Sequence, residues 1–115
     1  MKLLIVDDDT NIQRLYKEEL EEEGYDVTIA TTGTNALELF QKENFDIVTL
    51  DILMPDIDGI SLLRKMKEQK PDIPIIMSTA YDYRDDFAVW ASEAYIVKSS
   101  DLGELKKTIK KLLDK

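Results

Sequence analysis

Short apolar runs recur along this chain, and three of them end abruptly in charged side chains. These are residues 3–6 before Asp7, Asp8 and Asp9, residues 47–50 before Asp51, and residues 95–97 before Lys98. Uninterrupted apolar runs of this length, separated by helical patterns, are typical of buried parallel strands. Ligands of such sheets bind beyond the carboxyl ends of the strands, so we expect the charges to meet at one edge. Carboxylates held that close repel one another, which favours a divalent cation and phosphate chemistry.

Strand and helix patterns alternate from the first residues to the last. The expected strands are residues 2–7, 26–30, 46–51, 75–79 and 94–98. The expected helices begin near Thr10 and Thr34, after a turn at residues 55–59, around residues 87–91, and near Asp101. This alternation predicts an α/β fold, a flavodoxin-like (βα)5 doubly wound parallel sheet with strand order 2-1-3-4-5. In that order the first and third strands are neighbours, which brings Asp7, Asp8 and Asp51 into one crevice.

The first helix has recognisable end signals. Thr10 offers an N-cap with Gln13 three residues later, the spacing of a capping box, and Asp9 is the other candidate for the cap. Gly24 is a suitable C-terminal cap. The residues expected to face the core from this helix are Ile12, Leu15, Tyr16 and Leu20.

The chain contains no cysteine and no histidine. Disulfides, thiolate catalysis, imidazole bases and the usual zinc sites are therefore excluded, and a bound metal must use oxygen ligands, which favours Mg²⁺. The formal net charge of −9 argues against direct nucleic-acid binding, because phosphate contacts need clustered Lys and Arg. The one basic cluster is expected to be the solvated face of an amphipathic helix and consists of Lys106, Lys107, Lys110 and Lys111.

The length of 115 residues suits one domain with a sizeable core. The first apolar run is too short, and too soon followed by charge, to be a signal peptide, and no stretch reaches transmembrane length. We therefore expect a cytoplasmic protein without membrane contact. We also expect residues 1–115 to form a single domain without an output domain.

Asp51 has two interpretations. As a structural carboxylate it would bond loop amides at the end of its strand. As a nucleophile it would attack a phosphorus atom and become an acyl phosphate. Aspartyl phosphatases carry a second acid two residues after the nucleophile, but here that position is Leu53. An acyl phosphate on this chain should therefore persist, which suits a signal better than rapid turnover.

The other candidates also have plain structural interpretations. Thr79 suits a strand, although its hydroxyl is able to donate to a phosphoryl oxygen. Lys98 is either an ordinary surface lysine or a point charge for phosphate. Tyr95 is typical of a core position whose hydroxyl finds a partner.

Taken jointly, the motifs resemble one family over the whole chain. They are Asp7-Asp8, Asp51 with Met54-Pro55 and Asp58-Gly59, Ser78-Thr79-Ala80, and Tyr95 with Lys98. In order and spacing they resemble the receiver domain of two-component response regulators, in its stand-alone, CheY-like form. The resemblance implies a phosphoryl donor that is a histidine kinase or a histidine phosphotransfer protein. It also implies a downstream protein target, which the sequence does not name, and a monomer or weak homodimer.

The resemblance implies a metal site on one side of the crevice. Asp51 would be the phosphoacceptor, and Asp8 and Asp51 would bind Mg²⁺. Asp7 would act mainly through a metal-bound water, and Leu53 through its backbone carbonyl.

On the other side, the resemblance implies contacts to the phosphoryl group. Lys98 would pair with it, Thr79 would donate a hydrogen bond to it, and the backbone of Leu53 and Ala80 would contact it. Tyr95 matches the aromatic switch position. Phosphorylation would then alter the surface of the fourth helix, fifth strand and fifth helix.

Two features depart from the family pattern. Ser99 follows Lys98 where the family usually has proline, and a cis peptide is much costlier without proline, which favours a trans bond here. The stretch from Thr79 to Lys98 is short and lacks the usual glycine, so the fourth helix should be shortened or irregular.

Two alternatives belong to other functional classes. One is a pseudo-receiver that binds partners without phosphate, against which the full set of acceptor and metal residues argues. The other is an aspartyl phosphatase, against which Leu53 argues.

Overall fold

The fold is a parallel sheet covered by helices. The computed structural model describes residues 1–51, 56–79, 94–97 and 102–113. Its sheet has the strand order β2-β1-β3-β4-β5, and the strands are β1 (Lys2–Val6), β2 (Asp26–Ala30), β3 (Ile47–Leu50), β4 (Ile75–Thr79) and β5 (Ala94–Val97). All neighbouring strands pair in parallel. The predicted doubly wound sheet and its strand order are therefore confirmed.

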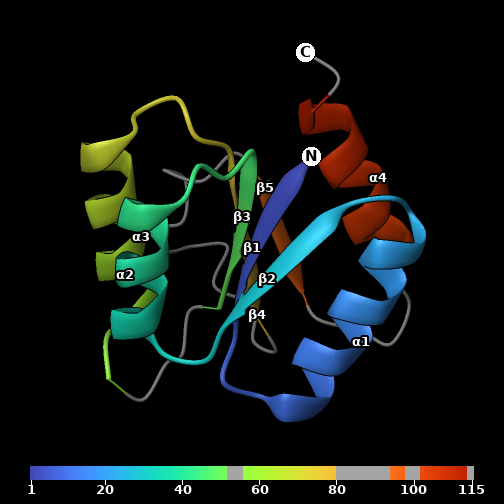
Figure 1. Ribbon diagram of the computed structural model, residues 1–115, viewed down its shortest axis with the longest axis horizontal. Helices are drawn as coiled ribbons and strands as arrows, with labels where there is room; N and C mark the ends of the chain where they lie inside the picture. Colours follow the sequence, from blue (N-terminus) through green and yellow to red (C-terminus); the bar gives the residue numbers. More distant parts are fainter. Residues whose placement is uncertain (52–55, 80–93, 98–101, 114–115) are drawn as a thin grey trace.

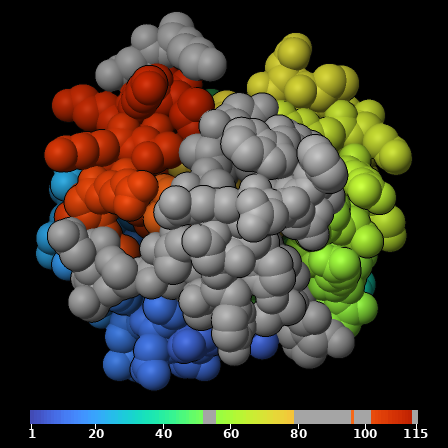
Figure 2. Space-filling view, turned by 180° about the vertical axis from the view of Figure 1, so that it is seen from behind, coloured from blue at the N-terminus to red at the C-terminus, as the bar shows by residue number. Residues whose placement is uncertain are grey.

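Helices cover both faces of this sheet. The described helices are α1 (Thr10–Glu22), α2 (Gly33–Lys42), α3 (Gly59–Gln69) and α4 (Gly103–Leu113). Figure 1 shows α2 and α3 on one face and α1 and α4 on the other. Seen from behind, α4 and the segment containing α3 lie on opposite flanks (Figure 2). The fourth expected helix, around residues 87–91, lies outside the described residues. The helix labelled α4 therefore corresponds to the fifth expected helix, which was predicted to begin near Asp101.

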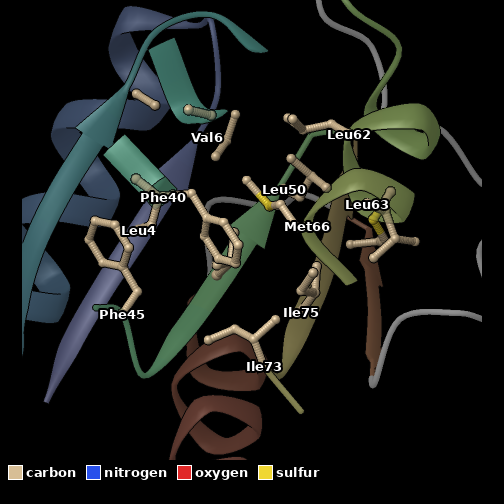
Figure 3. Close-up of a cluster of buried hydrophobic side chains, with 14 residues drawn as sticks. Leu4, Val6, Phe40, Phe45, Leu50, Leu62, Leu63, Met66, Ile73 and Ile75 are labelled. Atoms are coloured by element: carbon tan, nitrogen blue, oxygen red, sulfur yellow. The ribbon is translucent and has the colours of Figure 1, made fainter. Parts of the chain in front are cut away.

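Two apolar clusters fill the layers because successive strand side chains point to opposite faces. Leu4, Val6 and Leu50 pack against Phe40 of α2 and Met66 of α3 (Figure 3). The second cluster joins the opposite strand faces to α1 and α4, and it includes Leu3, Ile5, Tyr16, Leu20, Ile96, Leu105 and Ile109. The core-facing residues predicted for the first helix all belong to it or pack against it.

The start of α1 decides between the two predicted caps. Asp9 is the N-cap and accepts from the amides of Asn11 and Ile12 at 2.9 and 3.3 Å. The capping box centred on Thr10 is therefore wrong, since Thr10 is already helical, and the Gln13 amide instead donates to the backbone oxygen of Asp7 at 2.6 Å. The two candidates are adjacent, and aspartate is the better N-cap of the two residue types. Asp9 is also the last residue with an extended backbone, the conformation that an N-cap requires.

Gly24 ends α1 as predicted. Its φ of +94° lies in the left-handed region, and its amide donates to the Glu21 carbonyl at 3.0 Å. A side chain there would be strained, which explains the glycine.

The basic cluster of α4 only partly fits its prediction. Lys107, Lys110 and Lys111 are exposed. Lys106 instead bridges to α1, with its ammonium 2.9 Å from Glu19 and 3.5 Å from Glu23. These carboxylates raise the pKa of Lys106 above its usual value. None of the described helices is long and apolar enough to cross a membrane.

Candidate metal site

The ladder between β1 and β3 sets the position of the site. Val6 pairs with Leu50, and the amide of Asp51 donates to the Val6 carbonyl at 3.0 Å. On the other side of β1, the amide of Asp7 donates to the Ala30 carbonyl at 3.2 Å. The pairing thus continues one residue beyond the strands. It holds the backbones of Asp7 and Asp51 side by side at the carboxyl edge.

Three carboxylates converge at this edge, as the sequence predicts. Each of Asp7, Asp8 and Asp51 has an oxygen within 4.8 Å of the others. Asp7 is 2% exposed and Asp51 is 5% exposed, whereas Asp8 is open to solvent. The arrangement is a half-enclosed cluster with one wet side, through which a ligand is able to enter.

The loop from β1 to α1 orients the first of these carboxylates. The amide of Asp9 donates to Asp7 Oδ1 at 2.9 Å, and Gln13 anchors the Asp7 carbonyl. Because Asp9 caps α1, the same turn serves both the helix and the site. Asp9 is therefore a supporting residue of the edge and not a member of the cluster.

The cluster fits a hard divalent cation. Two full charges 4.8 Å apart repel by roughly 3 kcal/mol at an effective dielectric constant of about 20, and the cluster holds three such groups. A cation would relieve that repulsion. Oxygens bound to one octahedral Mg²⁺ lie about 3 to 4.2 Å apart, and the three carboxylates here have oxygens within 4.8 Å of one another. With no histidine or cysteine in the chain, all side-chain ligands are oxygens, as Mg²⁺ prefers.

The remaining predicted site residues are only partly described. Thr79 is the last residue of β4 and pairs with Val97 of β5. Tyr95 lies in β5, paired with Met77. The other predicted members, Leu53, Ala80 and Lys98, lie outside the described residues, as does the Lys98–Ser99 peptide.

One carboxylate near this edge was missed by the sequence interpretation, which treated residues 55–59 as a simple turn. Asp56 Oδ1 accepts from the amide of Gly33 at 2.9 Å. Asp56 Oδ2 accepts from the amide and the hydroxyl of Thr34 at 3.0 and 2.7 Å. The Thr34 amide and hydroxyl, followed by the Gly33 amide, lower the pKa of Asp56 to about 2. No local pattern could have revealed these partners, which lie 22 and 23 residues earlier in the chain.

A buried polar pair was also missed. The Tyr16 hydroxyl of α1 lies 3.0 Å from the Ser78 hydroxyl of β4, and both residues are 2% exposed. The bond joins α1 to the strand residue immediately before Thr79. Tyr16 was predicted only as an inward-facing residue, and its periodicity carries no information about the partner.

A doubly wound sheet with acidic side chains at its switch point defines an α/β protein that binds its ligand at the carboxyl edge. The chain also matches the sequence model of the response regulator receiver domain over residues 3–110. It therefore belongs to the receiver-domain family of response regulators. A receiver domain is a signalling module and not a conventional enzyme.

Curated relatives agree in sequence. Sporulation initiation phosphotransferase F of Bacillus subtilis is 36% identical over 97% of this chain and 93% of that protein. The alkaline phosphatase synthesis transcriptional regulatory protein PhoP of the same organism is 34% identical over 97% of this chain and 48% of that protein. The chain thus spans about half the length of several curated relatives it matches.

Solved structures agree in fold. The response regulator protein TrrA of Thermotoga maritima, in complex with Mg²⁺-BeF, has a TM-score of 0.94 and 47% identity, covering 97% of this chain and 98% of that one. TrrA in complex with the histidine kinase ThkA has a TM-score of 0.92 and 47% identity, covering 97% of each chain.

Proposed function

We propose that this receiver domain accepts a phosphoryl group on Asp51 from a histidine kinase or a histidine phosphotransfer protein. The observation that carries the proposal is the nearly buried Asp51 carboxylate, which lies with Asp7 and Asp8 at the switch point of the sheet. The similar TrrA structures support it, because that protein was captured with Mg²⁺-BeF and with a histidine kinase.

In the proposed reaction, a carboxylate oxygen of Asp51 forms a bond to phosphorus. The bond between phosphorus and the donor imidazole nitrogen breaks, its electron pair stays on nitrogen, and the nitrogen then takes up a proton. The products are an acyl phosphate and a neutral histidine of the donor. Mg²⁺, when bound, would supply the positive charge that phosphoryl oxygens require. Asp8 and Asp51 would hold it, with Asp7 acting mainly through a metal-bound water. The backbone bond from Asp51 to Val6 restrains the nucleophile.

The phosphoryl side of the site is proposed from sequence position. Lys98 follows Val97, the β5 partner of Thr79, so we expect both residues at the same carboxyl edge. In the proposal Lys98 pairs with the phosphoryl group and the Thr79 hydroxyl donates to it. The backbone carbonyl of Leu53 is a metal ligand, and the backbone of Leu53 and Ala80 contacts the phosphoryl group.

The new group carries roughly −1.5 to −2 charges at neutral pH. In the proposal it draws the Thr79 hydroxyl inward, and Tyr95 moves into the vacated space, shifting an equilibrium that exists before phosphorylation. The surface of the expected fourth helix, β5 and α4 then changes, and a downstream protein reads it. An NMR spectrum of this surface that is unchanged by beryllofluoride would contradict the switch.

Leu53 supports a slow return to the resting state. It stands two residues after Asp51, where an aspartyl phosphatase would carry its second acid. We propose slow autodephosphorylation on this basis.

We also propose a cytoplasmic location, and a monomer or weak homodimer.

Incubation with acetyl phosphate or beryllofluoride and Mg²⁺ tests the function. Wild type should form a stable adduct and Asp51→Asn should form none. Asp9→Asn is a matched control, since asparagine also caps a helix and the substitution removes one charge next to the site. Steady phosphate release by wild type would indicate a phosphatase instead, and no adduct would indicate a phosphate-independent binding module.

A further inference from the structure

The segment that follows Asp51 is tied at both ends. At its start, the Asp51 amide is bonded to β1. Five residues later, Asp56 uses both carboxylate oxygens to accept three hydrogen bonds from Gly33 and Thr34 at the start of α2. An anion bonded by the first amides of a helix is also favoured by the helix dipole. The link therefore joins the chain leaving the metal site to α2, which packs on the sheet.

Packing reinforces this link. Gly33 is buried, and a Cβ on it would lie 1.5 Å from Ile57 Cγ2. Only glycine permits this approach, so the backbone of α2 and the side chain of Ile57 have matching shapes. The next residue, Asp58, caps α3 by accepting from the Ile60 amide at 2.9 Å. Residues 56–58 thus attach to the starts of both helices on this face (Figure 1).

Asp51 and Asp56 are close in sequence, and both are bonded to other parts of the fold. Only four residues separate Asp51 from Asp56, and each residue spans at most about 3.6 Å. Releasing Asp56 from α2 would let Asp56 occupy more positions, and holding Asp51 in one metal-binding position would then cost more conformational entropy. Asp56 touches none of the three clustered carboxylates in the described contacts, so its influence on them passes through the chain.

We propose that Asp56 is a positioning residue of the metal site, which strengthens Mg²⁺ binding by fixing the far end of the connection after Asp51 to α2. The inference deepens the proposed function and rests on its metal site. The low pKa of Asp56 is consistent with it, because the carboxylate stays charged and bonded throughout the neutral range.

The experiment compares variants that differ in the link and match in charge. In Asp56→Asn, an amide nitrogen replaces one of the two oxygens that accept from Gly33 and Thr34. This nitrogen is a donor and cannot accept those hydrogen bonds. Asp58→Asn removes the same charge two residues away, while asparagine still caps α3. Thr34→Val removes one bond without changing charge, and Thr34→Ser restores the hydroxyl. The readouts are the Mg²⁺ dissociation constant from calorimetric titration of the unphosphorylated protein, and urea unfolding of the same samples.

Asp56→Asn should weaken Mg²⁺ binding by roughly tenfold, the lower end of effects seen for residues that orient metal ligands. Thr34→Val should weaken it by about threefold, with recovery in Thr34→Ser, and Asp58→Asn should change it by less than about twofold. Equal dissociation constants for Asp56→Asn and Asp58→Asn would overturn the inference, even if the former is less stable.

If Asp56→Asn fails to fold, the Thr34 pair decides the question in the same way. Phosphorylation of wild type by acetyl phosphate is recorded in parallel. An unphosphorylated wild type would refute the proposed function, whereas normal phosphorylation with equal metal affinities would refute only the role of Asp56.

Discussion

The carboxyl ends of β1 and β3 separate two regions of opposite character, the apolar body of the sheet and its acidic edge. Val6 and Leu50 lie in the apolar cluster under α2 and α3, and the residues that follow them, Asp7 and Asp51, converge with Asp8 at the edge. Burial stabilises the first pair and is costly for the second. The apolar body of the sheet therefore supplies the free energy that holds the like charges together. A ligand that neutralises them should then be strongly favoured.

The largest expected effect on the free energy of unfolding comes from creating a cavity in the apolar body while leaving the acidic edge unchanged. Phe40→Ala leaves a cavity in a fully buried position and should lower the free energy of unfolding by about 3–5 kcal/mol. Glu38→Ala, on the exposed side of the same helix, should change it by less than about 0.5 kcal/mol. Urea unfolding measures both. A loss below about 1 kcal/mol for Phe40→Ala would show that this region does not carry the fold.

The second effect concerns the edge. In wild type, Mg²⁺ at about one hundred times its dissociation constant should add about 2.7 kcal/mol to the free energy of unfolding. Asp8→Asn should be more stable than wild type in EDTA by on the order of 1 kcal/mol, because one of three repelling charges is gone. It should gain little from Mg²⁺, so the order of stability reverses when metal is added.

Asp72→Asn is the control for that reversal, since its exposed carboxylate lies before β4 at the opposite edge of the sheet. It should respond to Mg²⁺ as wild type does. Thermal unfolding with and without metal is sufficient to measure the difference. If the unfolding temperature of wild type did not respond to Mg²⁺, the claim that the acidic edge is destabilising without a cation would be contradicted.

A smaller effect is expected from the hydroxyl pair on the other face. Tyr16→Phe leaves the buried Ser78 hydroxyl without this partner and should cost about 1–2 kcal/mol. Ser78→Ala should cost a similar amount, and the double variant should cost less than the sum, because neither hydroxyl of this pair then remains without the other. Additive costs in urea unfolding would show that the two hydroxyls are not coupled.

The smallest effect is a pH dependence at Asp56. Its pKa is lowered from 3.8 to about 2 in the folded state, so the unfolded chain takes up the proton first as the pH falls. Its contribution to stability is therefore complete above about pH 4 and is lost progressively towards pH 2. The gap in urea midpoint between wild type and Asp56→Asn should narrow between neutral pH and pH 2.5. A constant gap would contradict the depressed pKa.

The fold and the acidic edge were accessible from the sequence because both follow local rules. Apolar runs ending in charge mark parallel strands, and the topology of alternating strands and helices brings Asp7 and Asp51 together. Choosing between Asp9 and Thr10 as the cap was harder, because adjacent residues of similar capping ability differ only in backbone geometry.

Contacts between distant segments were not accessible in this way. The bonds from Thr34 to Asp56 and from Tyr16 to Ser78 join residues 22 and 62 positions apart. Their formation depends on how helices pack on the sheet, which periodicity does not encode. Composition predicted a turn at residues 55–59, and residues 56–58 are non-helical, whereas Gly59 already begins α3 and residue 55 lies outside the described residues. Composition could not show that Asp56 reaches the start of α2.

The central claim is that Asp51, among the three clustered carboxylates, becomes the acyl phosphate. The most direct measurement treats the protein with acetyl phosphate and Mg²⁺, reduces the acyl phosphate with borohydride, and locates the modified residue by peptide mass spectrometry. Hydride reduction of a phosphorylated aspartate gives homoserine, and we predict homoserine at position 51 alone, with none when Mg²⁺ is replaced by EDTA. Homoserine at Asp7 or Asp8, or an unmodified chain, would contradict the account.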